Sequence, residues 1–486
     1  MKLLYKTSLL AIGLFMTVRV SAQQDTTGSF TLERCIEYAL QNSIGSQNAQ
    51  LDKQIAAAKV KETIGIGLPQ ISASGSVVHN PKLQRFFTTY QDPANSKGPS
   101  FIPAADAARI GVQPGDVVGV QNFFQLQSSG TASLTANQLI FNGSYLVGLK
   151  ASKTYKELAT RNANVTKEQV IVQVSKAYYA VIINKERIGL FTNNIARVDS
   201  LLKNTKALHE NGLAESIDVD RIQVSLNNLT AERDKFLNLN ELGLELLKFQ
   251  MNYPMDRTIR VEGDIQDVRV ETNLEAYKQN WDYRTRPDYQ VLETNRKLQE
   301  LNIRNKFATG MPTMSAFGTL GYSTQSPNIA GVFKTNSHFA GEGGLGPDKW
   351  YNYSQIGLSL NIPLFSGGQR HYQVQQEKLN LLKIMNGYKS LKNGVDLDVK
   401  QSSLSFENAL KSLSVQKANM DLAARVAHVT KIKYEQGVGS NIEVIDAENS
   451  LRTAQTNYYS ALYDAMIAKV DLDKAFGKIL PNSVTQ

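Results

Sequence analysis

One short motif occurs twice in this chain, each time between long helical patterns. Residues 437–447 read GVGSNIEVIDA, and residues 212–221 read GLAESIDVDR. Each copy has a glycine, then an apolar residue and then an acidic first helical turn, which is typical of a turn between two helices. Aligned on the glycine, the copies give the equivalent pairs Leu213/Val438, Ile217/Ile442, Asp218/Glu443 and Val219/Val444. Two equivalent turns indicate an internal duplication.

The spacing of residues before each turn supports the duplication. Gly143 precedes Gly212 by 69 residues, and Gly367 precedes Gly437 by 70 residues. The neighbourhoods of the earlier glycines also match, since residues 140–144 read IFNGS and residues 364–368 read LFSGG. Because four landmarks agree, we expect the chain to contain two structural repeats.

The residues between these landmarks predict helices that are too long for an ordinary globular domain. No proline interrupts 144–209 or 367–436, and a helix of this length spans on the order of 100 Å. A further helix is predicted after each turn, over 216–251 and 441–476. Helices of this size need a coiled-coil or tubular assembly. In the last helix, alanine recurs every seven residues, which indicates a close, left-handed seam between helices. These alanines are Ala447, Ala454, Ala461, Ala468 and Ala475.

Four segments alternate with the period of a β-strand, at about 70–90, 121–141, 312–325 and 350–365. One face of each segment is small or apolar, and the other is polar but almost uncharged. A soluble sandwich would bury the apolar face, whereas a transmembrane barrel would turn it toward lipid. About thirty residues rich in Pro, Gly and Asp separate the first two segments, which suits an external loop.

The first 22 residues have the pattern of a secretory signal peptide, and a membrane anchor is the alternative. Lys2 and Lys6 precede an apolar run over 9–20, and small residues end at Ala22. No other stretch approaches 18 apolar residues. The net charge is +9, but no dense Lys/Arg run is present, so nucleic acid is not an expected partner. The single cysteine, Cys35, has no partner for an internal disulfide.

No pattern predicts an enzyme, a metal site or a cofactor site. The five histidines show no HExxH or close ligand spacing. Residues 341–346, GEGGLG, lie in a predicted loop with Pro347 after them and no helix to hold a phosphate. Residues 414–417 match SxxK inside a long predicted helix, without the companion motifs of that chemistry.

The chain resembles the TolC family of outer-membrane efflux and secretion channels over residues 30–478. The resemblance rests on the duplicated order of elements, the two glycine turns, the LFSGG junction and the opening pattern LERCIEYALQNS (32–43). It implies a homotrimeric channel-tunnel dominated by helices. Each protomer would give four strands to a 12-stranded transmembrane β-barrel and its long helices to an α-helical coiled-coil tunnel in the periplasm.

The expected layout follows from the resemblance and the patterns together. Four strands cannot close around a lumen, and an open sheet edge is not tolerated in lipid, so several chains must share the barrel. The layout comprises a signal peptide at 1–22, a first repeat at 23–253 with its tip at 210–218, an equatorial segment at 254–300, a second repeat at 301–478 with its tip at 437–443, and a C-terminal tail at 479–486.

The resemblance also implies an acidic ring and a gate at the periplasmic entrance. Glu443 and Asp446 match the two family aspartates that line this entrance, so three protomers would present six carboxylates to passing ions. The alternative is an acidic first turn that only favours the helix dipole. Asp218 and Tyr434 match positions that link the two tips, although Asp218 could equally serve as a helix cap. Gly439 stands where the family has an arginine, so the usual salt bridge is absent.

The tips themselves are candidates for binding a partner. The turn residues are Gly212, Leu213, Gly437 and Val438. Leu213 and Val438 give each turn an apolar side chain, which suits docking of a helical hairpin, with simple burial as the alternative. In the family this partner is a periplasmic adaptor protein, joined to an inner-membrane pump or ABC exporter.

We therefore predict a passive outer-membrane exit duct for small toxic compounds, embedded in outer-membrane lipid with its tunnel in the periplasm. A type I protein secretion duct and an exported coiled-coil scaffold without a pore are the alternatives. The residues do not distinguish drug efflux from protein secretion, and they do not identify the pump.

Overall fold

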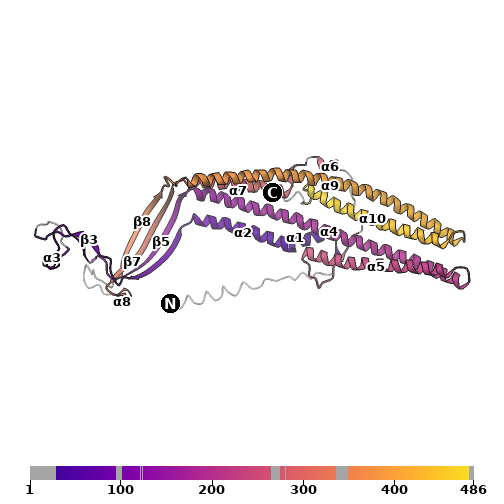
Figure 1. Cartoon of the computed structure of the whole chain (residues 1–486), viewed down its shortest axis with the longest axis horizontal. Helices are drawn as coiled ribbons and strands as arrows, with labels where there is room; N and C mark the ends of the chain where they lie inside the picture. Colours follow the sequence, from indigo (N-terminus) through magenta and orange to yellow (C-terminus); the bar gives the residue numbers. More distant parts are fainter. Residues whose placement is uncertain are drawn as a thin grey trace, which may run out of the picture. The chain divides into compact units, whose positions relative to one another are not determined.

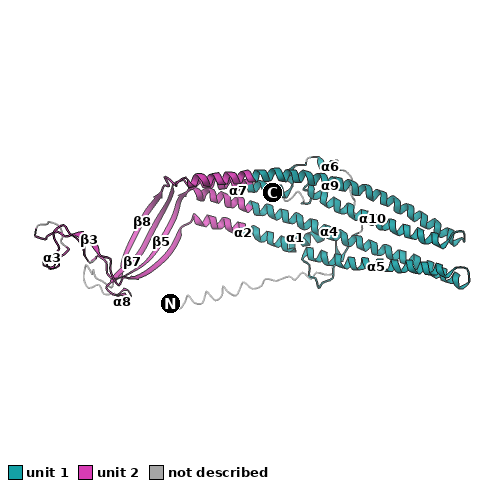
Figure 2. Ribbon diagram, in the orientation of Figure 1, with its two compact units in different colours: residues 1–55, 157–295, 384–486 teal, residues 56–156, 296–383 magenta. Residues whose placement is uncertain are grey.

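The computed structural model describes residues 29–94, 101–120, 122, 124–263, 274–279, 281–334 and 349–480. The predicted signal peptide at 1–22 and the GEGGLG stretch at 341–346 lie outside the described residues. The chain forms two compact units, shown in Figure 2. Unit 1 contains residues 1–55, 157–295 and 384–486, and unit 2 contains residues 56–156 and 296–383.

Helices make up most of unit 1, and four helices extend over residues of both units. These four are α2 (Ile44–Ile66), α4 (Gly143–Glu210), α7 (Pro287–Ala308) and α9 (Gln369–Glu435). The other elements of unit 1 are β1 (Ser29–Phe30), α1 (Leu32–Asn42), α5 (Ser216–Met251), β6 (Arg260–Val261), α6 (Glu275–Lys278), the 3-10 helix η2 (Tyr283–Thr285) and α10 (Asn441–Ala475).

Unit 1 contains two helical hairpins, α4 with α5 and α9 with α10 (Figure 1). Phe191 of α4 stacks on Phe236 of α5 with ring centroids 5.3 Å apart. In the second hairpin, Ala427 packs against Ala447 and Leu451. Four of the five alanines in the seven-residue series are buried, namely Ala447, Ala461, Ala468 and Ala475. Small side chains on this face let α10 approach its neighbours closely, which is what the repeat predicts.

The main core of unit 1 forms where α1 packs against α4 and α5. The side chain of Thr31 caps α1 by accepting a hydrogen bond from the backbone N–H of Arg34. Cys35 and Ala39 on α1 are completely buried in a cluster that includes Tyr178 of α4 and other apolar residues from α5 and α10. Burial raises the pKa of the Cys35 thiol to about 12, so this thiol is not a reactive group.

Unit 2 contains a four-stranded antiparallel sheet in the order β2-β5-β7-β8. Its strands are β2 (Gln70–His79), β5 (Ser128–Asn142), β7 (Thr313–Ser326) and β8 (Tyr351–Asn361). The register aligns the predicted faces across all four strands, as shown by the row Ile71, Ala136, Gly318 and Ile356. This apolar face is open, and Ile356 is 91% exposed.

The opposite face of the sheet is held by pairs of hydroxyl groups. Ser76 and Thr131 lie 2.8 Å apart, Ser74 and Ser133 lie 3.0 Å apart, and Thr135 and Thr319 lie 3.1 Å apart. Each pair joins neighbouring strands directly across the ladder, which is how polar cross-strand pairs stabilise a sheet. The two faces therefore differ in chemistry along their length, as the alternation predicts.

The segment between β2 and β5 contains two short strands and a helix, where we expected longer strands and a loop. We predicted strands over 70–90 and 121–141, but β2 ends at His79 and β5 begins at Ser128. Pro81 has no N–H to continue the ladder. Instead, β3 (Phe86–Thr89) pairs with β4 (Val117–Val120), and α3 (Ala104–Ile110) packs against them. Tyr90, Ala107, Val118 and Val120 form the buried core of this lobe.

The fourth strand also ends earlier than predicted. We predicted it over 350–365, but β8 stops at Asn361. Pro363 follows, and proline cannot donate a hydrogen bond to the ladder. Among the described helices, none is both long enough and apolar enough to cross a membrane.

Candidate functional site

The two hairpins end in turns with the same backbone geometry. Gly212 and Gly437 both have φ of 74°, which is the left-handed region that favours glycine. The next residue in each turn donates its N–H back over five residues, from Leu213 to Leu208 at 2.8 Å and from Val438 to Lys433 at 3.0 Å. Together with the shorter bond from each glycine, this is a Schellman motif, which satisfies the last carbonyl groups of a helix.

The same apolar side chains are exposed in both turns. Leu213 is 74% exposed and Val438 is 79% exposed. Their neighbours Ile217 and Ile442 are also nearly half exposed. Burial of the turn residues within the tip, which was the alternative to docking, is therefore not seen in the single chain. Each tip offers a small apolar surface next to an acidic helix start.

Polar contacts join the second tip to the first. The side chain of Asn441 is buried and donates a hydrogen bond of 3.3 Å to the backbone carbonyl of Asp218. Farther along α10, Glu448 forms an ion pair of 3.1 Å with Arg197 of α4. These contacts hold the α9–α10 hairpin against the α4–α5 hairpin near their tips.

The predicted link between Asp218 and Tyr434 differs in the structure. The hydroxyl of Tyr434 lies 3.3 Å from the hydroxyl of Thr205, a fully buried residue of α4. The carboxylate of Asp218 lies instead 3.8 Å from Arg221, one turn further along α5. Tyr434 of α9 thus contacts Thr205 of α4 and not the predicted partner Asp218.

The backbone explains why no arginine stands at Gly439. A Cβ atom at this position would lie 3.1 Å from the backbone nitrogen of Tyr434 and 3.2 Å from Cβ of Lys433. These contacts are tighter than ordinary van der Waals contacts, and a backbone atom cannot move aside as a flexible side chain does. The tight turn therefore favours glycine here.

Glu443 and Asp446 are exposed on the first two turns of α10. Ser440 caps this helix by accepting a hydrogen bond of 3.3 Å from the N–H of Glu443. Since the two carboxylates are three residues apart, they lie on one side of the helix. Neither carboxylate forms a hydrogen bond or ion pair within the part of the chain that the structure describes. Both are free to interact with ions.

Replacing Gly437 by alanine is expected to destabilise the fold by about 1 kcal/mol, because the left-handed conformation is unfavourable for a residue with a Cβ atom. Gly394→Ala is the matched control. Gly394 lies within α9 with open space around it, so alanine should stabilise the helix by about 1 kcal/mol. Thermal unfolding followed by circular dichroism measures both changes. Equal effects of the two substitutions would contradict the proposed turn geometry.

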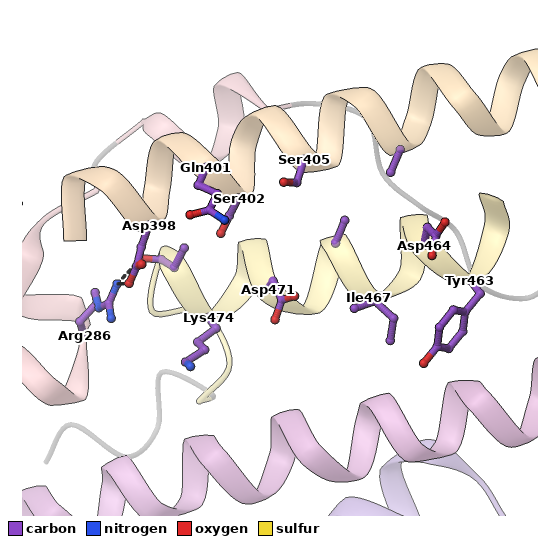
Figure 3. Close-up of a pocket in the computed structure, with 13 residues that line it drawn as sticks. Arg286, Asp398, Gln401, Ser402, Ser405, Tyr463, Asp464, Ile467, Asp471 and Lys474 are labelled. Atoms are coloured by element: carbon purple, nitrogen blue, oxygen red, sulfur yellow. Dashed lines mark hydrogen bonds and ion pairs between the residues drawn. The ribbon is translucent and has the colours of Figure 1, made fainter. Parts of the chain in front are cut away.

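A polar cavity that sequence analysis missed lies between α9 and α10 (Figure 3). Its volume is about 520 Å³. Arg286 at its edge forms ion pairs with Asp288 at 2.7 Å and with Asp398 at 3.3 Å. Asp471 on its wall pairs with Lys176 at 2.7 Å. Apart from Arg286 and Asp288, the paired residues lie more than 100 residues apart in the sequence, so no local pattern reveals them.

The charges around this cavity are largely paired, and the arrangement contains no nucleophile with an adjacent base. Within the described ranges, no group of three metal-ligating side chains is present. The ion pairs of Arg286 and Asp471 therefore give this cavity a structural role.

Comparison with known proteins gives consistent matches. A family model described as "Outer membrane efflux protein" matches residues 285–478. The outer membrane protein TolC of Vibrio cholerae is 21% identical over 367 residues, which cover 73% of this chain and 78% of that protein. The probable outer membrane lipoprotein SilC of Salmonella typhimurium is 22% identical over 469 residues, which cover 95% of this chain and 90% of that protein.

Two solved structures share the fold over nearly the whole chain. The open state of the MtrE outer membrane channel of Neisseria gonorrhoeae matches with a TM-score of 0.67 at 17% identity, covering 94% of this chain and 91% of that chain. The outer membrane protein VceC of Vibrio cholerae matches with a TM-score of 0.65 at 14% identity, covering 92% and 96%. The predicted fold class is thus confirmed, and this chain is similar to TolC-family outer-membrane efflux channels, with the family match lying over residues 285–478.

Proposed function

We propose that this chain is the outer-membrane exit duct of a tripartite efflux system, through which small toxic compounds leave the periplasm. The observation that carries the proposal is the pair of equivalent tips, each with an exposed apolar residue beside an acidic helix start. A duct needs an end that a partner can bind and an opening that ions and solutes can pass. The exposed apolar residues at the tips suit the first property, and the acidic helix starts suit the second.

Three copies of the chain form the duct. The outer strands of the four-stranded sheet, β2 and β8, each pair on one side only within the described residues. Joining β8 of one copy to β2 of the next satisfies these edges and produces a closed, twelve-stranded sheet. The open apolar face then turns toward outer-membrane lipid, and the hydroxyl-lined face turns toward the lumen.

Leu213 and Val438 form the docking surface for a periplasmic adaptor protein, which connects the duct to an inner-membrane pump or ABC exporter. Exposed apolar residues at a helical turn suit contact with the apolar face of a helical hairpin. Docking on both tips pulls the two hairpins apart and opens the entrance.

Planar-bilayer recording of the purified full chain tests the proposal. A detergent-extracted trimer should give discrete conductance steps, while detergent buffer without protein gives none. A trimer without conductance would refute the duct. A monomer without conductance would refute the assembly on which the duct depends.

The bond between Tyr434 and Thr205 serves as a latch that holds the entrance closed. We expect Tyr434→Phe to increase the single-channel conductance or the open probability, because the variant keeps the ring and loses only the hydroxyl. Tyr155→Phe, on an exposed tyrosine of α4, is the matched control and should conduct as wild type does. Wild-type conductance from Tyr434→Phe would exclude Tyr434 as a latch.

A further inference from the structure

A large cavity in unit 2 lies where the sheet meets the helices. Its volume is about 910 Å³, and it is lined by the end of α7, the segment after β8 and the first turns of α9. All of its lining residues belong to unit 2, and β8, α7 and α9 can be followed to this point in Figure 1. The cavity is not part of the tips or of the polar cavity between α9 and α10.

One half of the cavity is apolar and open. Leu364 and Phe365 are each 89% exposed, and Phe307 and Met311 are about half exposed. Leu364 follows the alternation of Ile356, Leu358, Leu360 and Ile362, all of which are also exposed. The apolar half of the cavity therefore continues the apolar face of β8. An aliphatic chain lying along this face could reach the cavity without crossing a polar surface.

The other half of the cavity is cationic. Arg370, His371 and Lys378 line it, and no aspartate or glutamate does. None of these three side chains forms an ion pair with a carboxylate in the described ranges. Lys378 places its Nζ atom 6.0 Å from the ring centroid of Phe307, which keeps this cation next to the apolar half. The start of α9 adds the positive end of a helix dipole.

Gly310 at the end of α7 makes room for Arg370. A Cβ atom at position 310 would lie 1.7 Å from Nη1 of Arg370, so any larger residue would displace the guanidinium group. The guanidinium group therefore lies directly beside the backbone of Gly310. Arg370 is partly buried, while His371 and Lys378 are exposed around it.

We propose that this cavity binds one anionic phospholipid of the membrane leaflet next to the helices. Arg370 and Lys378 bind the phosphate, and the acyl chains lie along Leu364 and the apolar face of β8. The charge pattern selects this occupant, because the two cations Arg370 and Lys378, which have no carboxylate partner in the described ranges, lie beside an exposed apolar surface and match a headgroup phosphate followed by acyl chains. A zwitterionic lipid offers the phosphate together with a competing cation, so it binds less tightly.

The proposal rests on the membrane position of the sheet given under the proposed function. It adds a specific ligand site, and it predicts selectivity among lipids that a smooth apolar surface would not have. To test the lipid site, the full chain is placed in nanodiscs of phosphatidylcholine that contain a minor share of phosphatidylglycerol, and the retention of phosphatidylglycerol is measured. Native mass spectrometry counts the lipids of each class that remain bound per protomer.

The double variant Arg370→Gln/Lys378→Gln is expected to bind phosphatidylglycerol about tenfold more weakly, since each cation near a membrane surface contributes a several-fold factor. The matched control is Lys383→Gln/Lys389→Gln, which removes two exposed cations from the same helix outside the cavity. The control should retain phosphatidylglycerol as wild type does.

Equal retention by the cavity variant and the control would overturn the lipid site. A cavity variant that loses its trimeric state, with unchanged lipid per protomer, would also overturn it, because a second copy of the chain would then cover the cavity. Conductance of the same preparations tests the proposed function separately. A conducting cavity variant with full lipid retention refutes the site and leaves the duct intact.

Discussion

Replacing Glu443 by glutamine and Asp446 by asparagine in one chain is expected to lower the cation preference of the channel by about tenfold. Both carboxylates are exposed, lie on one side of α10 and have no ionic partner in the described part of the chain. In the proposed trimer, three copies bring six carboxylates around one narrow opening. A ring of like charge concentrates cations locally and repels anions, so removing it reduces the permeability ratio of cations to anions.

Reversal potentials under a salt gradient measure this ratio, and block by multivalent cations gives a second readout that should weaken in the same variant. Glu241→Gln with Glu407→Gln is the matched control, since it removes two exposed carboxylates that lie away from the tips. Unchanged selectivity in the tip variant would refute the ring. An equal loss in the control would show that net charge, and not the ring, sets the selectivity.

The features that were predictable from sequence are those set by neighbouring residues. The long helices α4 and α9 extend over Gly143–Glu210 and Gln369–Glu435, close to the expected 144–209 and 367–436. Helical period, absence of proline and a terminal glycine are all local signals. The faces of the sheet were predictable for the same reason, because alternation fixes them once a strand forms.

The features that sequence analysis missed depend on contacts between distant residues. In the segment between β2 and β5, Tyr90 packs against Val118 and Val120 in one buried core. The alternation of apolar and polar residues does not predict that these residues come together. Likewise, the partner of Tyr434 is Thr205, which lies 229 residues away on another hairpin. The contact partner of the Tyr434 hydroxyl is set by how the helices of the two hairpins pack together.

Glu168 is another residue whose behaviour depends on distant contacts. It lies on α4, is only 6% exposed and belongs to unit 1. The pKa of its carboxyl group is raised to about 7, mainly by burial and also by the nearby Asp288, while Arg286 and Lys474 act in the opposite direction. Arg286 cannot offset the burial fully, because it already forms ion pairs with Asp288 and Asp398.

The sign of the pH effect follows from this shift. The carboxyl group has an ordinary pKa of 4.5 when unfolded and about 7 when folded, so the folded protein binds this proton more tightly. Its contribution to stability is fully present below pH 4.5 and is lost as the pH rises to about 7. The free energy of unfolding falls by at most about 3 kcal/mol over this pH range, since one pKa unit corresponds to about 1.4 kcal/mol.

Glu168→Gln is therefore expected to remove much of the loss of stability between pH 5 and 8, and to stabilise the protein at the upper end by up to about 3 kcal/mol. Glutamine keeps the size of the protonated side chain and cannot ionise. Unfolding midpoints of wild type and variant across this pH range measure the difference. Glu241→Gln, on an exposed glutamate of α5, should follow the wild-type curve. Parallel curves for wild type and Glu168→Gln would show that Glu168 is already ionised in the folded protein, with its charge compensated by Arg286 and Lys474.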